Sequence, residues 1–130
     1  ERERLDYINY EINCIGSWLA GYHAKSRGDD RRWPDCRGIE IGRFINGTCS
    51  NDEDEDSGWV LEFSIPFEHF REFGASFPPK NGQIMYIGLH RLGGKTNFQY
   101  SQWAPSQTEK PNYHRPQDFG KVTFSTEVLK

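Results

Sequence analysis

A two-residue alternation of apolar and polar positions is the dominant pattern of this chain. In the segment from Tyr7 to Ile15 every second side chain is apolar, and the side chains between them include Asn9, Glu11 and Asn13. Successive side chains of an extended strand point to opposite faces of a sheet. The segment therefore predicts a strand with one core face, on Ile8, Tyr10, Ile12 and Cys14, and one polar face.

The same alternation recurs along the chain. It predicts strands over Gly38 to Ile45, Gly58 to Ile65 and Gln83 to Leu92, with weaker candidates over Asn97 to Trp103 and Lys121 to Phe124. Apolar residues three apart after Pro66 predict one short helical turn, from Phe67 to Phe73. Turns rich in Pro and Gly separate these runs. The predicted fold class is all-β, a β-sandwich or jelly-roll-like domain with one short helical turn.

Length and charge narrow the class of protein. A chain of 130 residues has room for a single domain, and its 15% aromatic content argues against disorder. The net charge of −3 argues against nucleic acid as a partner. No apolar run approaches the roughly 18 to 20 residues of a membrane span. The chain begins at Glu1 with a strand close behind, which we interpret as a processed or truncated product.

The acidity is concentrated in one run, Asp52 to Asp56. Its alternating aspartates have the spacing of an EF-hand loop, but Ser57 stands where that loop needs Gly and Phe63 where it needs Glu. A solvated hairpin loop is the better interpretation. The three cysteines, Cys14, Cys36 and Cys49, show no C-x-x-C spacing, so no zinc site and no metal ligands are predicted. Free thiols are favoured, with a Cys36–Cys49 disulfide left open for an exported protein.

No catalytic residue is predicted. The chain has no G-x-S-x-G elbow, no H-E-x-x-H pair and no glycine-rich phosphate loop before a helix, and its four histidines are scattered in sequence. Hydrolysis of glycosides by a pair of carboxylates remains an alternative, since it needs two carboxyl groups across a cleft. No cofactor is predicted.

Sugar recognition requires fewer specific residues than catalysis does. Pyranose rings stack on flat aromatic side chains, and planar polar groups bind their hydroxyls. Gln102 and Trp103 end a predicted strand and run into a Pro-containing segment. Trp18 and Trp33 lie near predicted loops. Trp59 keeps strand phase with Leu61 and Phe63, and is predicted to be core.

Three segments together resemble carbohydrate-binding module family 9. They are GWVLEFSIPF (residues 58–67), QIMYIGLHR (residues 83–91) and the closing run from QWAP (residues 102–105) to NYHRPQDFGKVTF (residues 112–124). The N-terminal YEINCIG (residues 10–16) is similar to a strand of the same family. The resemblance implies a β-sandwich that binds saccharides, exported by a bacterium and associated with polysaccharide-degrading enzymes.

The resemblance also implies roles for particular residues. Trp103 corresponds to an aromatic platform and Arg91 to a cation that binds hydroxyls, with Trp18 as a second platform. The supporting candidates are Glu11, Asn13 and Gln102. His114 and Arg115 either join the site or fix the last turn, with Arg115 paired to a carboxylate.

The departures from the family pattern carry expectations of their own. Full domains of this kind have strands before the point where this chain begins, so residues 1–130 are expected to lack N-terminal strands. Exposed strand edges would then pair with another chain. Structural calcium occurs in some relatives, without ligands that map onto this sequence. The main alternative to sugar binding is a structural or interaction module of a larger glycan-degrading protein, in which Trp103 and Trp18 would be buried in the core or against another domain.

Overall fold

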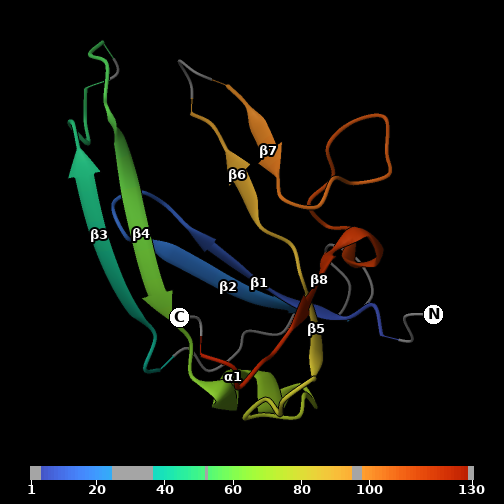
Figure 1. Cartoon of the computed structure of the whole chain (residues 1–130). Helices are drawn as coiled ribbons and strands as arrows, with labels where there is room; N and C mark the ends of the chain where they lie inside the picture. Colours follow the sequence, from blue (N-terminus) through green and yellow to red (C-terminus); the bar gives the residue numbers. More distant parts are fainter. Residues whose placement is uncertain (1–3, 25–36, 52, 95–97, 129–130) are drawn as a thin grey trace.

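A computed structural model describes residues 4–24, 37–51, 53–94 and 98–128 of the chain (Figure 1). These residues form eight strands, one short α-helix and one turn of 3₁₀ helix, which confirms the predicted all-β class. The strands are β1 (Tyr7–Ile12), β2 (Trp18–His23), β3 (Glu40–Asn46), β4 (Gly58–Ser64), β5 (Ile84–Ile87), β6 (His90–Leu92), β7 (Tyr100–Gln102) and β8 (Gly120–Thr123). The helices are α1 (Phe67–Glu72) and η1 (Pro116–Asp118).

The strands pair as four antiparallel ribbons of two strands each within the described residues: β1–β2, β3–β4, β5–β8 and β6–β7. In Figure 1 the β3–β4 ribbon stands at the left, the β6–β7 hairpin rises beside it near the centre, and α1 lies at the base. Each of these strands has one edge without a strand neighbour in the described part of the chain. Open edges favour pairing with another chain, and that pairing remains a prediction.

The core lies on both faces of the β1–β2 ribbon. On one face Tyr22 stacks on Phe73, which follows α1, with ring centroids 4.2 Å apart. On the other face Tyr7 stacks on His23 at 4.8 Å and meets Phe119 edge-on at 5.8 Å. Tyr7 is only 9% exposed although it shares the strand face predicted to be polar. That part of the prediction is wrong, because the segment preceding β8 covers this end of the face.

The first predicted strand ends earlier than its sequence pattern suggests. A turn follows Ile12, in which the backbone N–H of Asn13 donates to the carbonyl of Ser17 at 2.9 Å. Gly16 takes a left-handed φ of 84° there, a conformation that glycine adopts without strain. The turn starts β2 at Trp18, a strand that the sequence pattern did not predict. Trp33 and Cys36 lie outside the described residues.

The remaining elements match their predictions with small shifts of boundary. The segment predicted as one strand, Gln83 to Leu92, is divided into β5 and β6 at Gly88 and Leu89. The acidic run forms part of the loop between β3 and β4, as predicted, with Asp52 itself outside the described residues. The hydroxyl of Thr48 bonds to the carboxylate of Asp54 in this loop at 2.9 Å.

Two further predictions concern thiols and membranes. Cys14 and Cys49 are free thiols in the structure. No helix in the described ranges has the length and apolar run that crossing a membrane would take.

Candidate functional site

One face of the β6–β7 hairpin is exposed and carries the two main site candidates. Arg91 on β6 is paired directly with Ser101 on β7, so their side chains share a face. The backbone N–H of Trp103 donates to the carbonyl of Leu89 at 3.0 Å, which extends the ladder by one pair. Trp103 therefore shares that face with Arg91. The structure brings these two predicted residues together.

A shallow hollow of about 330 Å³ lies at this face. It is lined by Leu89, Arg91, Ser101 and Trp103, which share this face, and by their strand neighbours His90 and Gln102. Trp103 is 54% exposed and Leu89 is 56% exposed. A flat aromatic ring with an accessible surface next to a guanidinium has the two properties that stacking and hydrogen bonding to a sugar require.

Trp59 on β4 is the site residue that the sequence pattern misassigned. It is 41% exposed, so its prediction as a core residue is wrong. The Arg91 guanidinium carbon lies 5.8 Å from the centroid of the Trp59 ring, within the range of a cation–π contact. Strand alternation gave the face on which Trp59 lies, but not whether another element covers that face.

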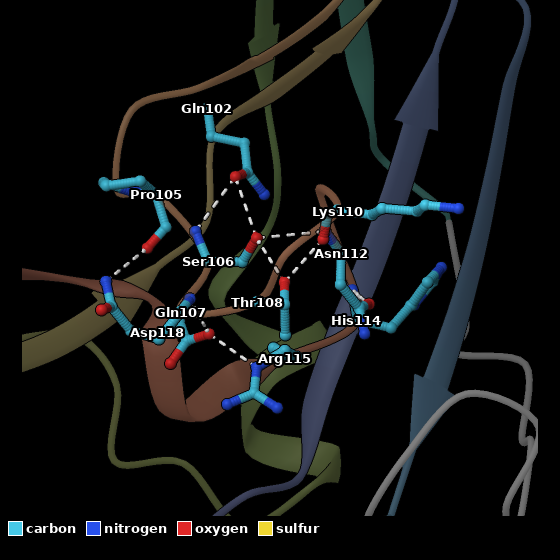
Figure 2. Close-up of polar contacts among 10 residues, drawn as sticks. All are labelled: Gln102, Pro105, Ser106, Gln107, Thr108, Lys110, Asn112, His114, Arg115 and Asp118. Atoms are coloured by element: carbon cyan, nitrogen blue, oxygen red, sulfur yellow. Dashed lines mark hydrogen bonds and ion pairs between the residues drawn. The ribbon is translucent and has the colours of Figure 1, made fainter.

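Gln102 lies on the opposite face of the hairpin, where it is paired with His90. Its side-chain oxygen accepts hydrogen bonds from the backbone N–H of Ser106 at 3.0 Å and from the Ser106 hydroxyl at 3.1 Å (Figure 2). The Ser106 hydroxyl oxygen also accepts the backbone N–H of Asn112 at 3.1 Å. Gln102 thus organises the loop that follows Trp103, and its predicted contact with a ligand remains a prediction.

His90 is enclosed on that same inner face. Its ring stacks on Tyr113 with centroids 4.4 Å apart and approaches Phe119 at 5.9 Å. Both ring nitrogens of His90 are buried without a hydrogen-bond partner among the described residues. Burial lowers the pKa of His90, and the charge of His114 lowers it further. Both effects favour the neutral form of His90.

The closing segment is fixed by an ion pair, as one of the two sequence interpretations expected. Arg115 Nε lies 2.6 Å from Asp118 Oδ2, which also accepts the backbone N–H of Gln107 at 2.8 Å (Figure 2). The bond from Arg115, then that from Gln107, lowers the pKa of Asp118. His114 is turned toward the core, where its Nδ1 lies 2.7 Å from the Tyr7 hydroxyl. His114 and Arg115 thus anchor the segment that joins Trp103 to β8.

The other candidates lie on or beside the β1–β2 ribbon. Asn13 Oδ1 accepts the backbone N–H of Ser17 at 2.8 Å, so this side chain helps to close the turn. Glu11 is exposed and accepts a bond from Asn9 at 2.8 Å. Trp18 is 41% exposed and opposite Ile12, on the other face of the ribbon from Glu11. Roles for these three residues in binding remain predictions.

Histidines distant in sequence converge next to the hairpin. The rings of His23 and His114 are 5.7 Å apart and share contacts with Tyr7. This grouping could not be seen in the sequence, where His23 and His114 are 91 positions apart. Within the described ranges, no group of three or more His, Cys, Asp or Glu side chains is placed to hold a metal ion.

Comparison with known families adds the last observation. Residues 1–124 of the 130-residue chain match the family described as carbohydrate-binding family 9. The chain belongs to carbohydrate-binding family 9. No curated protein and no solved structure gives a significant match. Family 9 membership confirms the resemblance seen in the sequence motifs and points to a saccharide as the class of ligand.

Proposed function

We propose that this family 9 domain binds a saccharide on the exposed face of the β6–β7 hairpin. Trp103 provides the stacking surface, and the guanidinium of Arg91 donates hydrogen bonds to sugar hydroxyls. The observation that carries this proposal is the placement of Trp103, 54% exposed, on the same strand face as Arg91 in one hollow. Stacking removes apolar area of ring and sugar from water, which stabilises the complex.

Trp59 has a supporting part in this proposal. Contact with its ring restricts the guanidinium of Arg91, so less side-chain entropy is lost when a sugar binds. Trp59 also adds aromatic surface from a second ribbon. The family resemblance implies Trp18 as a second platform, and that role remains a prediction beside the contact from Arg91 to Trp59.

The proposed domain is non-catalytic and works beside polysaccharide-degrading enzymes, as an exported bacterial protein. Family membership supports this context. Localisation of the native protein by cell fractionation tests it, and a purely cytoplasmic location would contradict it. The alternative of a structural module without a sugar site expects Trp103 and Trp18 to be buried in the core or against another domain; both are exposed on this chain, which leaves burial against another domain as the remaining form of that alternative.

Binding itself is tested by calorimetric titration with cello-, xylo- and manno-oligosaccharides. We expect at least one series to bind, and Trp103→Ala to weaken that binding by about tenfold or more, equivalent to about 1.4 kcal/mol. Phe44→Ala is the matched control, since Phe44 is an exposed aromatic residue on a different ribbon. Equal binding by the parent chain and Trp103→Ala would contradict the site.

A further inference from the structure

The indole of Trp103 rests directly on Gly120, the first residue of β8. A Cβ atom placed on Gly120 would lie 2.4 Å from Cζ3 of Trp103, 2.8 Å from Cη2 and 3.0 Å from Cε3. These three atoms form the outer edge of the six-membered ring. Carbon atoms without a bond between them do not approach so closely. The side chain of Trp103 therefore occupies the space that any other residue at position 120 would fill.

The strand register explains this contact. β7 and β8 pair with successive parts of one segment, β7 with β6 and β8 with β5. Gly120 is opposite Ile87, and Trp103 is hydrogen-bonded to Leu89 two residues further on. Residues two apart on a strand share a face. Trp103 and Gly120 thus follow one another on the same face, and the long indole reaches back over the glycine.

The backbone conformation of Gly120 does not itself require glycine. Six glycines of the described residues have a positive φ, and Gly120 is not among them. Inside a strand, glycine has a cost in stability relative to residues with a side chain, and it often marks a close approach by another group. Here the approaching group is the indole of Trp103.

We propose that Gly120 is a positioning residue that seats Trp103 and thereby sets the affinity of the saccharide platform. The effect on affinity rests on the proposed function, whereas the contact between the Trp103 indole and the Gly120 backbone, which we call the Trp103 seat, is a feature of the fold. The backbone of β8 supports one side of the ring, and the bond to Leu89 fixes the Trp103 backbone. A ring held in one orientation on a regular strand loses less freedom on binding than a mobile one.

The test combines Gly120→Ala with Trp103→Phe, because a phenyl ring extends less far from its Cβ than an indole and cannot reach the position of Cη2. Gly94→Ala is the matched control, since a Cβ at Gly94 meets nothing within 4 Å and its φ is not positive. Two readouts are taken for each chain. One is calorimetric affinity for cello-, xylo- and manno-oligosaccharides; the other is near-UV circular dichroism, with the Trp103 signal obtained as the difference from the matching Trp103→Phe chain.

We expect Gly120→Ala to change the Trp103 difference spectrum and to weaken sugar binding about tenfold, whereas Gly94→Ala changes neither. In the Trp103→Phe chain, the same alanine is expected to have no further effect on affinity. If Gly120→Ala prevents folding, we expect the added change Trp103→Phe to restore folding, because it removes the atoms that the new Cβ would meet. An unchanged spectrum, or equal loss of affinity or folding in both backgrounds, would overturn the proposal. If no oligosaccharide binds the parent chain, the proposed function fails, and the difference spectra alone decide the seat.

Discussion

The guanidinium carbon of Arg91 lies 5.8 Å from the centre of the Trp59 ring, so a residue of β6 is joined to one of β4. The two strands belong to separate ribbons of the described fold. Cation–π contacts at exposed positions contribute about 0.5 to 1 kcal/mol. We therefore expect a coupling of that size in a double-mutant cycle with Arg91→Ala and Trp59→Ala, measured by urea unfolding. Strictly additive losses would show that the contact does not persist in solution.

We expect sugar binding by Arg91 to depend on the shape of its guanidinium as well as on its charge. Arg91→Lys keeps the positive charge but removes the planar fork that can donate two parallel hydrogen bonds to neighbouring hydroxyls. We expect this change to weaken oligosaccharide binding about five- to tenfold in calorimetric titrations while leaving urea unfolding nearly unchanged. Lys121→Arg, on the β5–β8 ribbon, is the control for a change between the two cations. Full affinity in Arg91→Lys would show that the guanidinium does not provide the proposed hydrogen bonds.

Stability is expected to fall as pH drops from about 7 to 5, and His90 is one cause. Its pKa in the folded chain is lowered by burial, then by the charge of His114. As the pH falls below the unfolded value of about 6.5, the unfolded chain takes up the proton first, so the stability contribution of neutral His90 is progressively lost.

The change His90→Phe should isolate that effect. A phenyl ring retains a stacking surface for Tyr113 and removes both unpartnered nitrogens. We expect urea unfolding to show a smaller loss of stability between pH 7 and 5 in this variant than in the parent chain. His69→Phe serves as a comparison, because His69 is buried beside Tyr10 and away from Tyr113. An identical pH slope in the parent and in His90→Phe would contradict the assignment.

Asp118 is expected to stabilise the segment that connects Trp103 to β8. Its carboxylate accepts bonds from Arg115 and from the Gln107 backbone, and bonds to charged groups contribute more than neutral ones. Asp118→Ala should lower the free energy of unfolding by about 1 to 2 kcal/mol. Asp118→Asn, which retains an acceptor for Gln107, should lower it less. Because the pKa of Asp118 is lowered in the fold, its contribution is present above pH 4 or so and is lost as the pH falls through the folded value.

The family resemblance named Arg91 and Trp103 as site residues, but the face that they share follows from the pairing of β6 with β7 in the structure. Alternation within each strand defines which side chains share a face once that pairing is known. Trp59 could not be assigned in the same way. Its alternation with Leu61 and Phe63 holds in β4, but whether that face is covered depends on contacts with other ribbons. Such contacts join residues far apart in the chain.

The two sides of the β1–β2 ribbon illustrate the same limit. The turn at Asn13 and Gly16 consists of residues that favour turns, so β2 could have been expected from local chemistry. The burial of Tyr7 could not, because it depends on His114 and Phe119 from the other end of the chain. The contact of Trp103 with Gly120 could not be expected from local sequence either. It arises because β7 and β8 pair with successive parts of one segment.

The central claim is that Trp103 is the saccharide platform of this family 9 domain. Calorimetric titration of the parent chain, Trp103→Ala and the control Phe44→Ala with the same cello-, xylo- and manno-oligosaccharides tests it most directly. We predict binding by the parent chain, a loss of about tenfold or more in Trp103→Ala, and near-parent affinity in Phe44→Ala. Undiminished binding by Trp103→Ala, or an equal loss in Phe44→Ala, would contradict it.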